Sequence, residues 1–306
     1  MKDPMPSIHE PLKLHHEVHV CTTPNTGAAA QRVLLLHGLG SSSADWEDQL
    51  PALTPTFDVV TCDLRGHGRS RAQPCAETSI AEMAEDVAGL LRTLSLRDGR
   101  APTPTHIVGL SMGGMVGLQL ALDAPELARS LVLVNATAQA RPRTLRQRLL
   151  VWQRKALVRV LGMRVLAKVL AARLFPKPEQ ALHRARLRRR WPENDTRAYL
   201  GAVDAITRWS VTSRLEEVAC EVLLVAGDRD YTPVATKHAL AATLPSARVC
   251  VIPDSGHATP IDQATAFNTE LLQFLTGRGR GPCLTEPRGE TMNPAAHGAR
   301  QAPTDR

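Results

Sequence analysis

The stretch THIVGLSMGGMVGLQLAL, Thr105–Leu122, decides how the rest of the chain is interpreted. It begins as a short apolar run typical of a buried strand and continues with apolar residues at helical spacing. Between the halves lies Gly109-Leu110-Ser111-Met112-Gly113. Such a turn can hold a serine in strained geometry, with its Oγ above a strand end and a helix N-terminus facing any oxyanion. Alternatively, the glycines only let a strand and a helix pack closely, and the pentapeptide alone leaves both interpretations open.

Length and composition are those of an ordinary globular protein. The 306 residues are 43% hydrophobic and 22% charged, which suits one large domain with an insertion, or two domains. No apolar run approaches the roughly 18 residues of a membrane span, and residues 1–20 lack the features of a signal peptide. Six cysteines are scattered without a C-x-x-C pair, so we predict reduced thiols and a cytoplasmic location.

The net charge of +7 is unevenly distributed. Residues 141–190 contain 13 Arg and 3 Lys against the single acid Glu179, a local charge of +15, so the other residues together carry −8. This asymmetry argues against a uniformly basic nucleic-acid-binding protein and indicates a locally basic module. Three interpretations stay open: a solvated helix face, attraction of acidic substrates, or, with Trp152 and Phe175 nearby, contact with an anionic membrane. A solvated face is the ordinary outcome.

Strand-like and helical patterns alternate along the chain, which predicts a mainly parallel sheet covered by helices on both faces. Ser79 and Glu82 form a capping-box pattern at the start of an amphipathic helix over 79–96. Expected strands cover 33–36, 57–62, 105–109, 131–134, 222–226 and 249–252, with 13–20 at the edge of the sheet. Other helices are expected over 45–53, after Ser111, near 233–244 and over 263–275.

Residues 138–214 interrupt this alternation. Their apolar residues repeat every three or four positions with arginines around them, which predicts helices with one apolar stripe: Leu145, Leu149, Trp152, Ala156, Val160, Met163, Ala167, Leu170 and Leu174. We therefore predict an α/β core made of residues 1–137 and 215–276, with residues 138–214 as a basic helical cap. The tail, 277–306, is rich in Gly and Pro and is predicted to be disordered.

Two further turns carry the groups that a nucleophilic serine needs. The strand over 222–226 leads into Asp228-Arg229-Asp230, and the strand over 249–252 leads to His257. The carboxyl ends of parallel strands share one edge, where active groups gather. The order Ser111, aspartate, His257 is the one expected when an imidazole activates a serine on such a turn and a carboxylate orients the imidazole. Spacing alone leaves both Asp228 and Asp230 open.

A third turn, His37-Gly38-Leu39-Gly40, follows the strand over 33–36. It can direct the backbone N–H of Leu39 toward the serine, and together with the N–H of Met112 it would form an oxyanion hole. His37 and His67 lie in turn motifs, and we interpret them as structural hydrogen-bonding groups.

Polar residues in two other segments are interpreted as structural. Asp63, Arg65 and Ser70 are expected to shape the loop after the strand over 57–62. His15, Glu17 and His19 would share one face of a strand, but a polar edge strand is favoured over a metal site because zinc requires strict ligand geometry.

Five motifs occur together: HGLG (37–40), DLRGHGRS (63–70), GLSMGG (109–114), AGDRDYTP (226–233) and SGH (255–257). With them the sequence resembles the α/β-hydrolase superfamily over about residues 12–276. The resemblance implies that superfamily's fold, with a cap inserted after the sixth core strand. Its G-x-x-D pattern, counted from Gly227, selects Asp230. Ser111 argues against the dehalogenase and epoxide hydrolase branches, which have an aspartate at this turn, and favours the esterase, lipase and enol-lactonase branches.

We therefore predict a serine hydrolase that cleaves a carboxylic ester through an acyl-enzyme. The predicted triad is Ser111, His257 and Asp230, and the oxyanion donors are the N–H groups of Leu39 and Met112. The predicted substrate is a small-molecule ester or lactone, without cofactor, metal or nucleic acid, and contact of the cap with an anionic membrane is a further hypothesis. The alternatives are an enol-lactonase or carbon–carbon bond hydrolase on the same triad, and a non-catalytic ligand- or membrane-binding protein of this fold.

Overall fold

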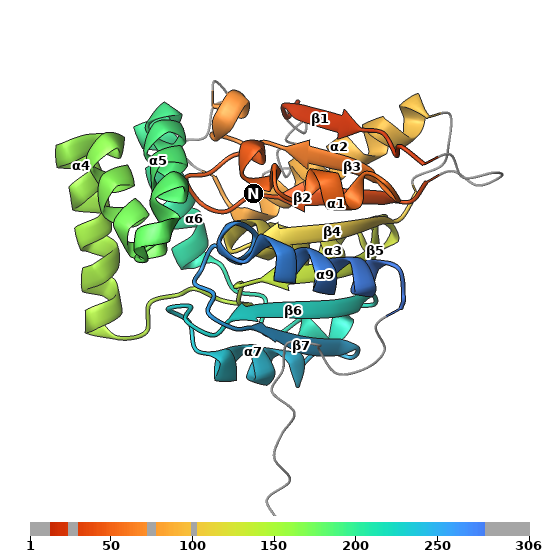
Figure 1. The fold of residues 1–306 in the computed structure, drawn as a ribbon. Helices are drawn as coiled ribbons and strands as arrows, with labels where there is room; N and C mark the ends of the chain where they lie inside the picture. The colour runs from red at the N-terminus through yellow and green to blue at the C-terminus, as the bar shows by residue number, and fades with distance from the viewer. Residues whose placement is uncertain (1–12, 24–29, 72–77, 99–102, 279–306) are drawn as a thin grey trace, which may run out of the picture.

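A seven-stranded sheet organises the structure, a computed structural model that describes residues 13–23, 30–71, 78–98 and 103–278 (Figure 1). The strand order is β1-β3-β2-β4-β5-β6-β7, and every neighbouring pair is parallel except β1 with β3. The predicted mainly parallel sheet is confirmed. The strands are β1 (His16–His19), β2 (Arg32–Leu36), β3 (Asp58–Cys62), β4 (Thr105–Leu110), β5 (Ala128–Val134), β6 (Glu221–Gly227) and β7 (Ala247–Ile252).

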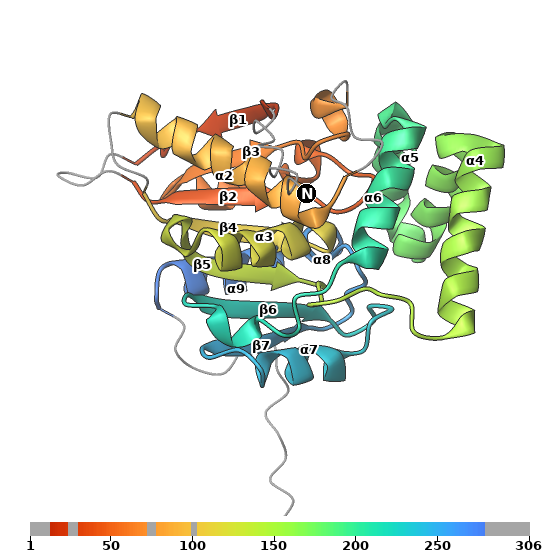
Figure 2. The ribbon, with the colours of Figure 1, turned by 180° about the vertical axis from the view of Figure 1, so that it is seen from behind.

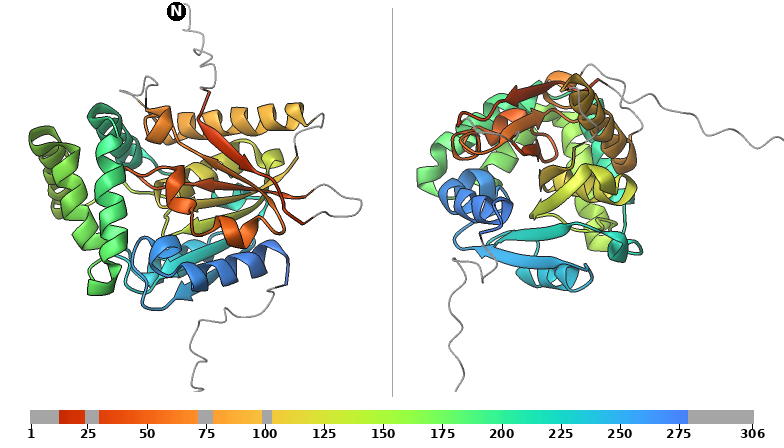
Figure 3. Two further views of the ribbon diagram at one scale, coloured as in Figure 1. Left: turned by 45° about the horizontal axis from the view of Figure 1, so that its top comes forward. Right: turned by 90° about the vertical axis from the view of Figure 1, so that its right-hand side faces the viewer.

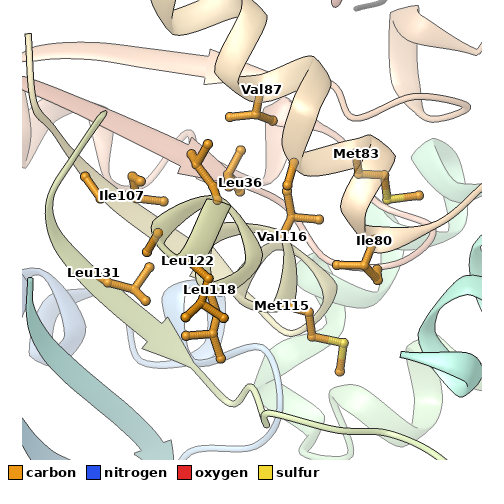
Figure 4. Packing of buried hydrophobic residues seen from close by; sticks show 14 of the residues in the cluster. Leu36, Ile80, Met83, Val87, Ile107, Met115, Val116, Leu118, Leu122 and Leu131 are labelled. Carbon is orange, nitrogen blue, oxygen red and sulfur yellow. The ribbon is translucent and has the colours of Figure 1, made fainter. Parts of the chain in front are cut away.

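The sheet is buried on both faces because alternate side chains of its strands enter two separate cores. In β2, Leu34 and Leu36 join one core, whereas Val33 and Leu35 join the other. The first core lies under α2 (Ile80–Arg97) and α3 (Met112–Asp123), and the second under α1 (Leu50–Leu53) and α9 (Ala264–Leu275) (Figures 1 and 2). Figure 4 shows Val87 of α2 and Val116 of α3 packed against Leu36 and Ile107 of the sheet.

The helix boundaries follow local chemistry. The predicted capping box is confirmed, because the Ser79 side chain accepts from the Glu82 N–H and the Glu82 side chain accepts from the Ser79 N–H. The single helix predicted over 45–53 is wrong: a 3-10 turn, Ser43–Trp46, is followed by the separate helix α1. Pro51 lies in the first turn of α1, where its missing N–H costs no helical hydrogen bond.

Helices fill the insertion predicted over 138–214. Among the described strands it follows the fifth, β5, and not a sixth as the resemblance implied. Its helices are α4 (Leu145–Leu174), α5 (Ala181–Arg190) and α6 (Thr196–Arg208), and α4 and α5 stand beyond the carboxyl ends of the parallel strands (Figures 1 and 3). The remaining helices, α7 (Val234–Ala241) and α8 (Thr259–Asp262), flank β7 in sequence. From residue 279 onward the predicted tail lies outside the described residues.

The single apolar stripe predicted for the insertion is wrong. Gly162 has a φ of 73° and interrupts the helical backbone of α4. After it, Met163, Leu166 and Ala167 are buried in the core of the insertion. Before it, the residues of the predicted stripe face solvent, and Leu145 is 82% exposed. The break turns the second half of the stripe inward and leaves the first half outward.

The cysteines do not all follow the sequence prediction. Cys21, Cys62 and Cys220 have free thiols, but Cys250 is disulfide-bonded. The prediction of reduced thiols is therefore wrong for Cys250.

Candidate active site

Ser111 lies in a strained turn between β4 and α3. Its φ is 53° and its ψ is −112°, a conformation that residues other than glycine rarely adopt and that is typical of functional sites. Its N–H donates to the Val134 carbonyl at 2.8 Å. A Cβ at Gly109 would lie 2.3 Å from the Gly113 carbonyl oxygen, and one at Gly113 would lie 2.2 Å from that of Leu36. The flanking glycines are therefore required for the turn that presents Ser111.

His257 and Asp230 form a hydrogen-bonded pair. His257 Nδ1 lies 2.8 Å from Asp230 Oδ1. The Asp230 side chain is fully buried and also accepts from Lys237 Nζ at 2.9 Å and from the Thr232 hydroxyl. Burial alone would raise the pKa of Asp230, but these hydrogen bonds, that of His257 first, lower it to about 2. The ionised carboxylate accepts a hydrogen bond from the N–H at Nδ1. The other ring nitrogen, Nε2, is then a hydrogen-bond acceptor.

Asp228, the other acid left open by spacing, has a different position. Its Oδ1 accepts from the Ser255 N–H at 3.0 Å, and its own N–H donates to the Ile252 carbonyl at 3.1 Å. Asp228 thus joins the end of β6 to the loop that carries His257, while Asp230 contacts the imidazole itself.

The Tyr231 hydroxyl bonds to the second ring nitrogen of His257. Its oxygen lies 2.8 Å from His257 Nε2, and the ring centroids are 4.3 Å apart. Among the described residues no hydrogen bond joins Ser111 directly to His257. Tyr231 is 59% exposed overall, but burial of its hydroxyl end and the charge of Asp230 raise its pKa to about 12. The phenol is therefore a donor at neutral pH.

The loop after β2 lies beside Ser111. A Cβ at Gly38 would be 3.7 Å from Ser111 Cβ. His37 fixes this loop, because its Nδ1 donates to the Gly38 carbonyl at 2.8 Å and its Nε2 accepts from the Leu64 N–H at 3.0 Å. Burial lowers the pKa of His37, so it is neutral and structural, as predicted. Neither the Leu39 N–H nor the Met112 N–H has an acceptor among the described residues.

Comparison with known proteins decides the family. A model of the alpha/beta hydrolase fold matches residues 31–264. The chain belongs to the α/β-hydrolase family. The "Putative carbamate hydrolase RutD" of Agrobacterium fabrum is 34% identical over 86% of this chain and 98% of its own length. The corresponding protein of Variovorax paradoxus is 36% identical over 86% and 96%.

Solved structures of α/β-hydrolases agree with this assignment. The enol-lactonase of Burkholderia xenovorans has a TM-score of 0.75 and 26% identity, with 86% of this chain and 96% of that chain covered. A thermophilic esterase of Thermogutta terrifontis has a TM-score of 0.73 and 25% identity, with 86% and 93% covered. The relatives are named as hydrolases, and this chain is a hydrolase of the same family.

A cavity of about 790 Å³ in this α/β-hydrolase opens above Ser111 and His257. Apolar side chains of the helical insertion form much of its wall, among them Leu157, Leu170 and Trp191. A cavity of this size accommodates a drug-sized organic ligand. The insertion thus supplies an apolar wall opposite the polar groups that follow β4, β6 and β7.

Three residues that contact the candidate triad were missed in the sequence. Tyr231 lies within AGDRDYTP, but nothing in that motif indicates that its hydroxyl contacts His257. Lys237 is only 1% exposed. A lysine in the sequence predicts a solvent-facing charge, so its burial against Asp230 was not expected. Asn135 follows β5 at the same edge as the other groups, and this position was an available signal.

Asn135 positions the loop of His257. Its Nδ2 donates to the His257 carbonyl at 2.9 Å and to the Thr259 hydroxyl at 2.9 Å, while its Oδ1 accepts from the Gly227 N–H at 3.0 Å. Its φ of 48° is again in the left-handed region. One side chain thus ties the end of β6 to the segment that presents the imidazole.

The motif at 63–70 is structural, as predicted. Asp63 accepts from the N–H groups of Ser43 at 2.7 Å and Arg69 at 2.8 Å. Arg65 makes a two-pronged ion pair with buried Asp86, at 2.6 and 2.8 Å. At the sheet edge, Arg69 Nη1 lies 2.9 Å from His15 Nε2 and 2.8 Å from Glu17 Oε1.

Proposed function

We propose that this α/β-hydrolase cleaves carboxylic esters through an acyl-enzyme formed on Ser111. The observation that carries the proposal is the Asp230–His257 hydrogen bond of 2.8 Å beside a serine in strained geometry at the floor of an apolar cavity. A serine hydroxyl is a weak nucleophile, and an oriented imidazole base activates it.

The reaction follows from the roles of these groups. His257 Nε2 takes the Ser111 proton as Oγ attacks the ester carbonyl, and His257 then returns the proton to the leaving alcohol. Asp230 holds the Nδ1–H tautomer and stabilises the imidazolium. The N–H groups of Leu39 and Met112 donate to the oxyanion of the tetrahedral intermediate. Water, deprotonated by His257, then hydrolyses the acyl-enzyme.

Tyr231 must be displaced before this reaction begins. Its phenol donates to the Nε2 atom that has to accept the Ser111 proton. Because Tyr231 is 59% exposed, its ring has room to swing outward. A substrate that enters the cavity competes with the phenol for the space between Ser111 and His257.

The cavity favours an ester with a sizeable apolar acyl group. Its volume of about 790 Å³ is larger than a small carbamate requires, the substrate class named for the RutD relatives. Its leucine-lined wall also suits an apolar group better than a polar one. A lactone is a cyclic ester cleaved by the same steps, and the structural likeness to an enol-lactonase supports it as the second candidate.

The test measures hydrolysis of nitrophenyl esters of increasing acyl length, together with a lactone and a carbamate. We expect kcat/KM to rise from acetyl to longer acyl chains as more apolar surface enters the cavity. Ser111→Ala should lower ester turnover about 10⁴-fold or more and abolish labelling by a fluorophosphonate. Exposed Ser213 provides the matched control, and Ser213→Ala should keep wild-type rates.

Two results would contradict the proposal. If Ser111→Ala kept more than about a tenth of the ester turnover, the nucleophile would not be Ser111. If the wild-type protein hydrolysed the carbamate and none of the esters, the serine mechanism would stand and the ester assignment would fail.

A further inference from the structure

The outer face of α4 exposes a row of large apolar side chains. Leu145 is 82% exposed, Leu149 51%, Trp152 64% and Val160 79%. Their spacing of four, three and eight residues places them on one side of the helix. At 1.5 Å per residue the row is roughly 22 Å long. Single exposed apolar residues are normal on a protein surface, but several on one side of one helix indicate an interaction surface.

The row is exposed because of where α4 lies in the fold. Its other side faces the protein: Val158 is buried in the core of the insertion, and Lys155 Nζ pairs with Asp204 at 2.6 Å. Figures 1 and 2 show α4 as the outermost helix, at the end of the molecule beyond the carboxyl ends of the strands. We call the solvent-facing side from Leu145 to Val160 the outer face of α4.

Basic side chains border this outer face. Arg148 and Arg159 lie along one side of the row and Arg146 along the other, by helical position. None of these three has a carboxylate partner among the described residues. The whole of α4 contains six Arg, two Lys and no acid. An apolar stripe that includes a tryptophan, bordered by unpaired arginines, is the pattern of a helix that lies in a membrane interface.

We propose that the outer face of α4 binds the surface of an anionic phospholipid bilayer, with Trp152 at the headgroup level. The charge distribution selects this occupant. A second copy of the chain, joined through the same face, would bring two strongly basic helices together. An anionic lipid surface attracts each arginine and also receives the apolar row. No described helix is long and apolar enough to span a membrane, so the contact is interfacial.

This contact lies next to the cavity. Leu150 and Leu157 of the same helix line the cavity wall, so a bilayer bound to the outer face would lie beside the site. The proposal concerns binding alone and is independent of the ester assignment.

Trp152 makes a direct test available. The chain has four tryptophans, and the other three, Trp46, Trp191 and Trp209, are 1%, 6% and 8% exposed. Full-length protein is titrated with phosphatidylcholine vesicles, with and without phosphatidylserine. We expect a blue shift of tryptophan emission and co-sedimentation only with the anionic vesicles, both weakened by salt. In the Trp152→Phe variant the blue shift should disappear while co-sedimentation persists.

Charge and apolar variants complete the experiment. Each basic residue near an anionic surface typically raises vesicle affinity about 5-fold. Replacing Arg146, Arg148 and Arg159 together with glutamine should therefore lower vesicle affinity about 100-fold. Leu149→Glu should have a similar effect. Leu96 is 75% exposed and lies on α2, outside the insertion, so Leu96→Glu is the matched control and should bind like wild type.

Three outcomes would overturn the proposal. The wild-type chain could fail to bind anionic vesicles, or the triple glutamine variant could bind them unchanged. Alternatively, light scattering could show a dimer that Leu149→Glu dissociates, in which case the occupant of the outer face is a second copy of the chain.

Discussion

Replacement of Tyr231 by phenylalanine should make Ser111 more reactive. In the free protein the Tyr231 hydroxyl donates to His257 Nε2 at 2.8 Å, and in the proposed mechanism this atom is the base that activates Ser111. Phenylalanine retains the ring that lies 4.3 Å from the imidazole and removes only the hydroxyl. Nε2 is then free to accept the Ser111 proton.

The magnitude follows from the one hydrogen bond that is removed. A hydrogen bond between uncharged groups contributes about 0.5–1.5 kcal/mol net. The wild-type protein must break this bond before Ser111 attacks, so its loss should raise the rate constant about 2- to 10-fold. The Asp230–His257 pair is on the opposite side of the imidazole and stays intact.

The assay is the second-order rate of labelling by a small fluorophosphonate. In the proposed mechanism this reaction uses Ser111 and His257, and it can be measured without knowing the substrate. Tyr231→Leu, which also removes the ring, separates two effects. If the ring helps to hold the imidazole, the leucine variant should react more slowly than the phenylalanine variant. Labelling of Tyr231→Phe about tenfold slower than wild type would refute the reasoning and make the phenol a proton relay between Ser111 and His257.

Three other predictions concern Asp230 and its neighbours. Asp230→Asn should lower kcat of ester hydrolysis about 10⁴-fold, as for the equivalent change in serine proteases, whereas Asp228→Asn should lose far less; the reverse ranking would exchange their roles. Lys237→Met should lower the free energy of unfolding in urea by about 3–5 kcal/mol, because it leaves the buried carboxylate without its cation. Since the pKa of Asp230 falls from 3.8 to about 2 on folding, its stabilisation is complete above pH 3.8 and is lost as pH falls through about 2. Acid unfolding of Asp230→Asn should therefore have a shallower slope than wild type in that range, and equal slopes would contradict the assignment.

The sheet could be predicted because its strands obey a local rule. A strand such as β2 is buried on both faces and is an apolar run over Val33–Leu36. Ser79 with Glu82 marks a helix start by chemistry contained within four residues. Boundaries that depend on tertiary packing were less accurate. Trp46 and Leu53 are both buried and are seven residues apart, a spacing that a single helix would also bury on one face. Periodicity therefore did not reveal the break between Trp46 and Leu50.

The candidate site could be predicted where a residue's place in the chain fixes its place in space. Ser111, Asp230 and His257 each follow a parallel strand, so all three come to one edge of the sheet. Tyr231 and Lys237 could not be predicted in the same way. Their contacts depend on which way each side chain points from its loop or helix. A tyrosine or a lysine at such a position can equally face solvent, so the residue type does not predict a bond to His257 or Asp230.

The direction of the outer face of α4 could not be predicted from the sequence. Helical periodicity identifies residues that share a face, but it does not say which way the face points. Burying an apolar side chain stabilises the folded state. Leaving it exposed does not change the free energy of unfolding, because Leu145 and Trp152 are also in water in the unfolded chain. Folding energetics therefore permits the outward orientation that the break at Gly162 produces. Exposure of this row adds nothing to stability, so folding alone does not explain it. The proposed contact with an anionic surface gives both the apolar row and the arginines beside it a role, and the vesicle titration tests that role.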